Sequence, residues 1–328
     1  MSPMTSEDTE ARPSVVVTAR SFGSGDADPG GLLQKVGLRV EHADPAHDHA
    51  VLEEALSAAV AWIAGTSPID NRHLAAAPNL KIVARYGTGY DSVDLAAAAR
   101  RGVIVTNTPG ANAEAVADHT VGLMLAALRH LVAGDSASRE GLRPPLRGRE
   151  LGALTVGIVG FGNIGRAVAR RLIGGFGSRV LAYDPFVAPE RAREAGIEPV
   201  DDLSDLARAA DVLTLHMPGG GSAVVDAAFL SRMRPRTVLI NTARGDLLDE
   251  QAVASALAEG RLAAAAVDVL ASESATSSPL LDAPNAIITP HVAAQTTQAI
   301  DRMGMMAAEE VVRVLAREAP RYPVTVPT

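Results

Sequence analysis

Three charged or titratable residues in the second half of the chain each stand just after an apolar run. Arg244, Glu273 and His291 follow the runs TVLINTA, AAAAVDVL and NAIITP, respectively. An arginine fork can bind a carboxylate through two hydrogen bonds, and an imidazole titrates near neutral pH and can act as a base. A carboxylate beside that imidazole would fix its tautomer and stabilise its protonated form. The three residue types together therefore fit acid–base chemistry on a small carboxylic acid.

Each of these residues also has a purely structural interpretation. Arg244 could form a salt bridge with Asp246 or Asp249, which follow it closely. Glu273 could be a solvated loop carboxylate, and His291 could cap a helix or pack in the core. Hydride transfer at a 2-hydroxy acid would use all three side chains, because the substrate offers a carboxylate to the arginine and a hydroxyl proton to the histidine. The sequence does not show that they meet in space, so both interpretations stay open.

A glycine-rich stretch, TVGIVGFGNIGR from Thr155 to Arg166, has the order of strand, tight turn and helix. In a dinucleotide-binding loop, Gly160 would permit the turn, and Gly162 would let the backbone approach a pyrophosphate. Gly165 would allow close packing of the helix on the strand. The first N–H groups of the helix would face the phosphates. A plain glycine turn is the alternative for this stretch alone.

An acidic residue after the next apolar run favours the dinucleotide interpretation. Asp184 ends the run RVLAYD, about 20 residues beyond Gly165, where a carboxylate binds the ribose hydroxyls of NAD. Its alternative is a turn residue before Pro185. A carboxylate there would repel a 2′-phosphate, and the following PFVAP has no arginine to receive one. The sequence therefore predicts NAD as cofactor and disfavours NADP.

Short, continuous, β-branched apolar runs alternate with alanine-rich segments of helical length along the chain. This pattern is typical of parallel strands that are buried on both faces of a doubly wound α/β fold. The first series of runs begins at Ser14, Gly37, Ala59, Leu80 and Gly102. The second series begins at Leu154, Arg179, Asp211, Thr237, Ala263 and Asn285.

Domain boundaries follow from the breaks between these runs. Proline and glycine in NTPGAN end the first series, and a long helix is predicted over residues 113–132. The polar stretch from Gly134 to Gly152 is predicted as a loop or arm. We predict a discontinuous substrate-binding domain of residues 1–108 and 296–328, to which the last helix returns. Residues 109–295 would form the NAD-binding domain.

Composition excludes several classes of function. The formal net charge is −8 and no Lys/Arg run dominates, which disfavours nucleic-acid and anionic-membrane partners. The absence of cysteine excludes disulfides, thiolate zinc sites and cysteine nucleophiles, and no metal site is predicted. No apolar run reaches transmembrane length, and the polar, acidic N-terminus is unlike a signal peptide. The expected location is the cytoplasm.

The motifs resemble those of the D-isomer-specific 2-hydroxyacid dehydrogenase family. GFGNIGR, YDP, NTARGDLLDE, AAVDVLASE and NAIITPHVAAQT occur in the order and at the spacings of that family. The resemblance runs from about Val15 to Val324 and is closest to short phosphoglycerate-dehydrogenase-like members without a regulatory C-terminal domain. It implies a flavodoxin-like domain and a dinucleotide-binding Rossmann domain, both doubly wound parallel sheets. It also implies an NAD-dependent oxidoreductase that forms a homodimer through its NAD-binding domain.

The resemblance also implies roles for individual residues. Arg244 would bind the substrate carboxylate, His291 would be the acid–base residue, and Glu273 would orient His291. Cofactor contacts are implied for Thr88, Gly160, Gly162, Asn163, Ile164, Gly165, Asp184, Met217, Pro218, Thr242 and Asp268. Substrate contacts, partly through backbone amides, are implied for Arg85, Tyr86, Gly87 and Arg244.

Some features depart from the family pattern, and some alternatives stay open. The loop at Gly219–Gly221 is shorter than usual, and Ser274 stands where the family often has proline. A phosphorylated substrate is not favoured, because AGTSPID from Ala64 offers no arginine to join Arg85. Two other functions on the same fold remain: a non-catalytic, NAD(H)-sensing corepressor-like protein and a phosphite-type dehydrogenase.

Overall fold

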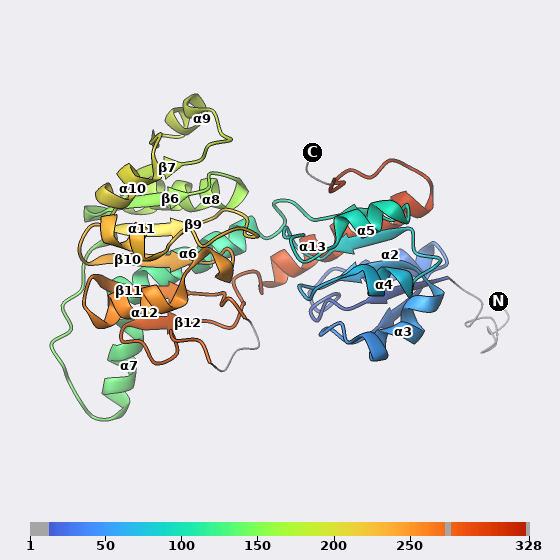
Figure 1. Cartoon of the computed structure of the whole chain (residues 1–328), viewed down its shortest axis with the longest axis horizontal. Coiled ribbons are helices and arrows are strands. Elements are labelled where there is room, and N and C mark those ends of the chain that lie inside the picture. Colours follow the sequence, from blue (N-terminus) through green and yellow to red (C-terminus); the bar gives the residue numbers. More distant parts are fainter. Residues whose placement is uncertain (1–12, 273–276, 326–328) are drawn as a thin grey trace. The chain divides into compact units, whose positions relative to one another are not determined.

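The computed structural model describes residues 13–272 and 277–325, and the chain divides into two compact units. Unit 1 comprises residues 1–112 and 295–328, and unit 2 comprises residues 113–294. Each unit is built on its own sheet, and all strand pairs within both sheets are parallel (Figure 1). The predicted class, two doubly wound parallel-sheet α/β domains, is confirmed. The substrate-binding and NAD-binding roles assigned to the two domains stay predictions at this point.

Unit 1 has a five-stranded sheet in the order β2-β1-β3-β4-β5, which is the flavodoxin-like order. Its strands are β1 (Ser14–Val17), β2 (Arg39–His42), β3 (Ala59–Ala64), β4 (Ile82–Arg85) and β5 (Ile104–Thr106). Its helices are α2 (Pro29–Lys35), α3 (His49–Ala58), α4 (Asn71–Ala75), α5 (Leu95–Arg100) and α13 (Thr297–Leu315). One core packs α3, α4 and α5 on the sheet, and the other packs α2 and α13 on its opposite face. The last helix therefore belongs to the unit formed by the N-terminal residues.

Unit 2 has a seven-stranded sheet in the order β12-β11-β10-β9-β6-β7-β8. Its strands are β6 (Thr155–Val159), β7 (Arg179–Tyr183), β8 (Glu198–Pro199), β9 (Val212–Leu215), β10 (Thr237–Asn241), β11 (Leu262–Val267) and β12 (Ala286–Ile288). The chain moves outward from β6 through β7 to β8 and then returns to β9 on the other side of β6. This reversal between β6 and β9 is the switch point at which such sheets bind ligands.

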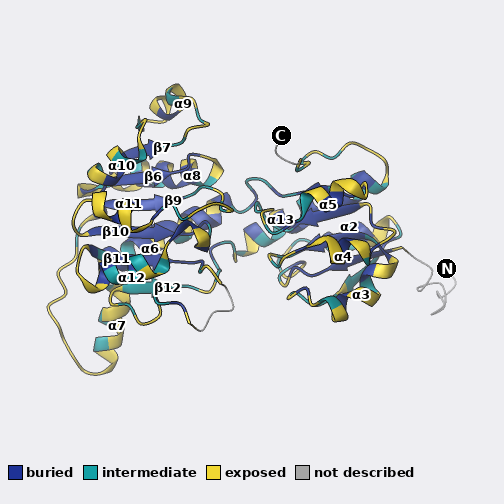
Figure 2. Ribbon diagram, in the orientation of Figure 1, coloured by how far each residue is buried: buried dark blue, intermediate teal, exposed yellow. Residues whose placement is uncertain are grey.

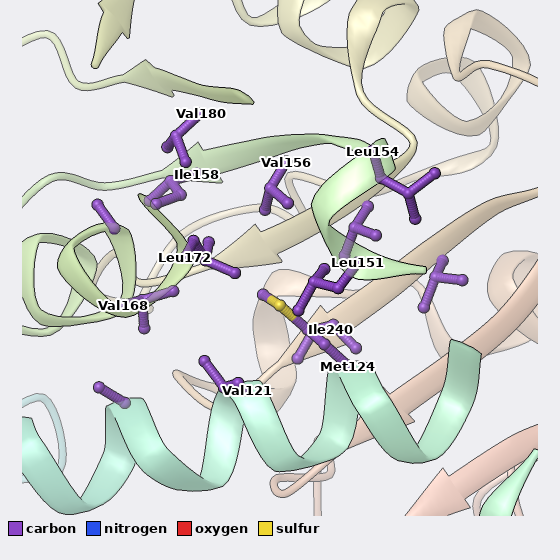
Figure 3. Close-up of a cluster of buried hydrophobic side chains, with 14 of the residues drawn as sticks. Val121, Met124, Leu151, Leu154, Val156, Ile158, Val168, Leu172, Val180 and Ile240 are labelled. Carbon is purple, nitrogen blue, oxygen red and sulfur yellow. The ribbon is translucent and has the colours of Figure 1, made fainter. Parts of the chain in front are cut away.

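Helices cover both faces of the unit 2 sheet. The helices of unit 2 are α6 (Ala113–Leu128), α7 (Leu131–Arg139), α8 (Asn163–Arg171), α9 (Pro189–Glu194), α10 (Leu203–Ala209), α11 (Ala227–Arg232) and α12 (Glu250–Ala258), with short helical turns η1 (Leu151–Ala153), η2 (Leu172–Phe176) and η3 (Gly245–Leu247). Side chains of α6 and α8 pack on one face, where Val121, Met124 and Val168 meet the strands (Figure 3). Side chains of α10, α11 and α12 pack on the other face. The buried strands are dark blue in Figure 2.

The predicted helix over residues 113–132 is two helices in the structure. α6 ends at Leu128, and His130 adopts a left-handed backbone with φ 53° before α7 begins. α7 also occupies Gly134–Arg139, which the sequence predicts as loop or arm. The sequence did not predict this break because the residues between the two helices include neither glycine nor proline. α7 buries none of its residues, and much of it is coloured as exposed in Figure 2.

Aspartate begins many of the helices. A carboxylate at the N-cap accepts hydrogen bonds from otherwise unpaired N–H groups of the first turn. Such caps are Asp28 (α2), Asp48 (α3), Asp70 (α4), Asp94 (α5), Asp202 (α10), Asp226 (α11) and Asp249 (α12). Among the helices of the described residues, none has the length and apolarity needed to cross a lipid bilayer.

Candidate functional site

Two of the loop glycines are required by the packing of unit 2 itself. Gly160 directly follows β6 with φ +90°, and a Cβ there would lie 2.5 Å from the carbonyl oxygen of His216. A Cβ on Gly165 would lie 2.3 Å from the carbonyl oxygen of Gly160, because α8 packs tightly on the turn. The chain can accommodate neither Cβ without moving backbone atoms.

Gly162 differs from these two glycines. Its backbone, with φ −76° and ψ −155°, is open to any residue, and a Cβ there would have no atom within 4 Å among the described residues. Gly162 is the N-cap of α8, where no side chain caps the first turn. Close approach of a pyrophosphate to these N–H groups would explain a glycine that the protein's own packing does not need. The loop thus fits a dinucleotide.

Asp184 lies beside this loop, at the end of β7. Its Oδ2 accepts a hydrogen bond from Phe161 N (2.7 Å), and its Oδ1 accepts one from Phe186 N (2.8 Å). Each carboxylate oxygen can accept a second hydrogen bond, so the held carboxylate could also receive ribose hydroxyls. It borders a hollow that is lined in addition by Tyr183, Val187 and other side chains from the β7 and β8 ends.

The other predicted cofactor residues of this region lie near the same edge of the sheet. Asn163 and Ile164 form the first turn of α8, where Asn163 Oδ1 accepts from Arg166 Nη2 (2.9 Å) and Ile164 packs on the core. Met217 and Pro218 follow β9, and Met217 is partly buried against the opposite core.

The short loop at Gly219–Gly221 is held by Asp246. Gly220 N donates to Asp246 Oδ2 (2.6 Å), and a Cβ on Gly219 would lie 2.3 Å from Asp246 Oδ1. Asp249 caps α12 by accepting from Ala252 N (2.9 Å). Asp246 and Asp249, the two possible salt-bridge partners of Arg244, therefore each accept a hydrogen bond from a nearby backbone amide.

Arg244 stands in a tightly held turn after β10. Fully buried Asn241 donates from Nδ2 to Arg244 O (2.7 Å) and accepts at Oδ1 from Ala243 N (3.0 Å). Arg244 Nη1 donates to Ala243 O (2.7 Å). Asn241 was not predicted as a site residue, although an amide at the end of an apolar run could have indicated it. Its two hydrogen bonds fix the backbone from which the guanidinium extends.

His291 stands in a turn that folds around Asp268. Its backbone is left-handed, with φ 53°, and His291 N donates to Asp268 O (2.9 Å). The Asp268 carboxylate, 1% exposed, accepts from Val292 N (3.0 Å), Ala293 N (2.9 Å) and Thr289 Oγ1. Asp268 thus holds both ends of the turn.

The charge on Asp268 is stabilised by these donors. Burial alone would raise the pKa of its carboxyl, but hydrogen bonds from His119, Thr289 and the turn amides outweigh burial and hold that pKa below its usual value. Asp268 is therefore ionised at neutral pH. Its predicted contact with the cofactor remains a prediction, as does that of Thr242, whose hydroxyl lies 2.9 Å from Thr120 Oγ1.

Glu273 lies outside the described residues, so its predicted pairing with His291 stays a prediction. The residues on either side of that segment are held by Glu250, the first residue of α12. Glu250 Oε1 accepts from Ala271 N (2.7 Å), and Oε2 accepts from Ser278 Oγ (2.7 Å).

In unit 1, Arg85 ends β4 and is buried, with Nε donating to Gly89 O (3.2 Å). The Tyr86 hydroxyl donates to Ile300 O (3.1 Å), so this side chain points into unit 1. The amides of Tyr86 and Gly87 already bind the carbonyls of Ala64 and Arg85. We expected these amides to be offered to a substrate, but both are already paired within the chain. The reason is that the chain keeps its pairing with the end of β3 for one residue beyond β4.

Thr88 is held from two sides within unit 1. Its Oγ1 donates to Asn112 Oδ1 (3.2 Å), and its carbonyl accepts from Asn107 Nδ2 (2.7 Å). These bonds fix the turn that follows Gly87. The binding roles of residues 85–88 stay predictions.

A second group of possible ligands in unit 1 was not predicted. His49, Asp70 and His73 place one ligand atom each within 4.8 Å of one another. Their mutual contacts already have a structural explanation, because Asp70 and His73 form the capping box of α4 and the rings of His49 and His73 stack at 3.7 Å. We therefore assign this group to the junction of α3 and α4.

Comparison with known proteins is consistent with the geometry. Residues 121–293 match the model for the NAD binding domain of D-isomer specific 2-hydroxyacid dehydrogenases. The chain is 43% identical over 260 residues to D-3-phosphoglycerate dehydrogenase of Mycobacterium tuberculosis, covering 78% of this chain and 49% of that protein. It is 39% identical over 264 residues to glyoxylate reductase of Korarchaeum cryptofilum, covering 78% of this chain and 79% of that one.

A solved structure, that of the TT0316 protein from Thermus thermophilus, superposes with a TM-score of 0.85 at 35% identity. It covers 95% of this chain and 100% of that chain. The chain spans about half the length of the phosphoglycerate dehydrogenases it matches. The family predicted from the motifs and NAD as its cofactor are confirmed. The chain belongs to the D-isomer-specific 2-hydroxyacid dehydrogenase family.

Proposed function

We propose that this chain transfers a hydride between NAD and C2 of a small D-2-hydroxy or 2-keto acid. The observation that carries the proposal is the turn built on Asp268. That turn presents His291 beyond β12 of the same sheet whose β6 end carries the glycine loop. Ligands of such sheets bind at the carboxyl ends of the strands.

The chain's residues would divide the work as follows. Arg244, on the turn fixed by Asn241, would bind the substrate carboxylate through its guanidinium fork. In oxidation, His291 would take the proton of the substrate hydroxyl, and in reduction it would return one to the carbonyl oxygen. Glu273 would orient the imidazole and stabilise its protonated form. NAD, when bound, supplies the nicotinamide carbon that accepts or donates the hydride.

We favour an unphosphorylated substrate such as glyoxylate or hydroxypyruvate. A phosphate needs cationic side chains, and the segment AGTSPID from Ala64 to Asp70 has neither lysine nor arginine. Arg85 is buried and donates its Nε proton to Gly89 O, which limits its reach. The glyoxylate reductase among the relatives supports this choice. The D-3-phosphoglycerate dehydrogenases, at 43% identity, support the phosphorylated alternative.

The test is a panel of 2-keto acids with NADH and NADPH, followed by loss of reduced-cofactor absorbance. Glyoxylate, hydroxypyruvate, pyruvate, phenylpyruvate and phosphohydroxypyruvate cover the relevant sizes and charges. We expect turnover with NADH on an unphosphorylated acid, and a loss of about 10²–10⁴-fold in kcat for His291→Ala with NADH affinity retained. NADH binding without turnover across the panel would instead support the NAD-sensing alternative.

We also propose that two copies associate through unit 2. α7 and the segment after it expose four large apolar side chains, Leu131, Val132, Leu142 and Leu146, each more than 40% accessible. A helix that buries nothing in its own chain gains little to offset the entropy lost on ordering. A second copy packed against this strip would supply the missing burial. The reaction would take place in the cytoplasm, without nucleic-acid or membrane partners.

A further inference from the structure

His119, on α6, contacts the turn that carries His291. His119 Nε2 lies 3.0 Å from Thr289 Oγ1, and Thr289 Oγ1 donates its proton to Asp268 Oδ1. A hydroxyl has a single proton, so Thr289 can only accept from the imidazole. His119 therefore donates from Nε2, and the hydrogen bonds run in one direction from α6 to a buried carboxylate.

That carboxylate fixes the rest of the turn. Asp268 accepts from the amides of Val292 and Ala293, and its carbonyl accepts from the amide of His291. His119 Nε2 also lies 3.5 Å from Asp268 Oδ1, so its donor points toward the negative charge. A buried carboxylate that loses a donor moves or takes up other partners, because an undersatisfied charge is costly in the protein interior.

We propose that His119 is a positioning residue for His291. Its Nε2–H orients the Thr289 hydroxyl, and Thr289 and Asp268 then hold the turn in the left-handed form in which His291 is presented. The inference rests on the proposed acid–base role of His291. His119 itself would contact neither substrate nor cofactor.

The next residue of α6 provides a matched comparison. Thr120 Oγ1 donates to Val116 O (2.7 Å), so it accepts from Thr242 Oγ1, 2.9 Å away. Thr242 lies two residues before Arg244, in the turn after β10. Adjacent positions on α6 therefore hold two different loops. Thr120→Val should raise KM for the keto acid, whereas loss of His119 should lower kcat.

The experiment compares three substitutions of His119 that keep, displace or remove its N–H donor. Gln places an N–H donor where imidazole Nε2 stands, Asn places it nearer the backbone, and Leu removes it. We expect His119→Leu and His119→Asn to lower kcat by about 10²-fold, since a misplacement of about 1 Å can cost that much. His119→Gln should keep kcat within about threefold of wild type. NADH should still bind to all three variants.

Two further measurements keep the test decisive. If His119→Leu does not fold, Thr289→Ser and Thr289→Val make the same comparison, because serine retains the hydroxyl and valine lacks it. The ring resonances of His291 in NMR spectra report its placement whether or not the enzyme turns over. They should shift in the Leu and Asn variants and stay in place in the Gln variant.

The outcomes separate this inference from the proposed function. Wild-type kcat in His119→Leu, unmoved His291 resonances in that variant, or equal losses in Gln and Leu would each overturn the positioning role. If no 2-keto acid is turned over by the wild type, the proposed function fails, and the resonances alone decide the positioning role. His42→Gln, at the exposed end of β2, serves as the unaffected control.

Discussion

A Cβ at position 160 would lie 2.5 Å from the carbonyl oxygen of His216, so the turns after β6 and β9 are in direct backbone contact at the switch point of the unit 2 sheet. Gly160 is also left-handed, at φ +90°. Gly162, two residues further on, has neither restriction. The two glycines therefore serve different purposes, one for the protein's own packing and one for a ligand.

Alanine substitutions should separate these purposes. Gly160→Ala should lower the free energy of unfolding by at least about 2 kcal/mol, because it combines a strained φ with a backbone clash. Gly162→Ala should change that free energy by no more than about 1 kcal/mol and yet weaken NADH binding by about tenfold or more. Denaturant unfolding and NADH fluorescence titration measure the two effects. Unchanged NADH affinity in Gly162→Ala would contradict the assignment of this loop to the pyrophosphate.

The carboxylate of Asp184 should determine which cofactor is used. It is held beside the glycine loop by the amides of Phe161 and Phe186. Asp184→Ala should raise KM for NADH and reduce the preference over NADPH, since both the ribose hydroxyl acceptor and the repulsion of a 2′-phosphate are lost. Steady-state kinetics with both cofactors check this. Asp205→Ala, which removes an exposed ion pair with Arg208 on α10, should leave both constants unchanged.

Periodicity and local motifs were enough to predict the fold because eleven of the twelve strands in the described residues lie in short apolar runs. The remaining strand, β8, was missed, since its two residues, Glu198 and Pro199, form no apolar run. The order β6-α8-β7 follows from the glycine spacing and Asp184, which are local in sequence. The helix break at His130 was missed, since a left-handed histidine has no signature in composition. Tyr86 was assigned from resemblance, and only the structure shows its hydroxyl bound to Ile300 O, more than 200 residues away.

The supporting residues of the candidate site were beyond sequence-based prediction for a similar reason. His119 and Thr289 are 170 residues apart and meet only because α6 packs beside β11, whose neighbour β12 leads directly to Thr289. Arg244 and His291 could be proposed as site residues because arginine and histidine suggest chemistry on their own. A threonine that orients a carboxylate suggests none until its partners are placed.

The exposed apolar strip on α7 and the segment after it should hold a dimer together. Leu142→Asp combined with Leu146→Asp should give a folded monomer, because both side chains are exposed in the single chain and a charge there would oppose burial against a second copy. Size-exclusion chromatography with light scattering measures the mass. Val51→Asp, on an exposed site of α3 in unit 1, should leave the mass unchanged. A wild-type chain that is already monomeric at micromolar concentration would refute the proposed homodimer.

A buried histidine in unit 1 should make stability depend on pH. His47 Nδ1 donates to Pro68 O (3.0 Å). Thr18 Oγ1 already accepts from Trp62 Nε1 and Gly65 N. Its proton therefore goes to His47 Nε2 (2.7 Å), which can accept it only while the ring is neutral. The pKa of His47 is lowered to about 4, and burial is the largest cause. The charges of Arg85 and His73 also lower it, whereas the hydrogen bond to Pro68 and the charge of Asp44 oppose the shift.

The sign of the effect follows from the two states. In the unfolded chain the pKa of His47 is about 6.5, so below that pH the unfolded state binds a proton that the folded state rejects until about pH 4. The contribution of His47 to the free energy of unfolding is therefore fully present above about pH 6.5. It falls as the pH drops, by about 2 kcal/mol at pH 5. Asparagine tolerates the left-handed backbone at this site. Between pH 7.5 and pH 5, the free energy of unfolding of His47→Asn should therefore fall by about 2 kcal/mol less than that of the wild type. Denaturant unfolding at both pH values measures it. His42→Gln, at an exposed position, should keep the wild-type dependence, and equal slopes for wild type and His47→Asn would show that His47 is not the titrating group.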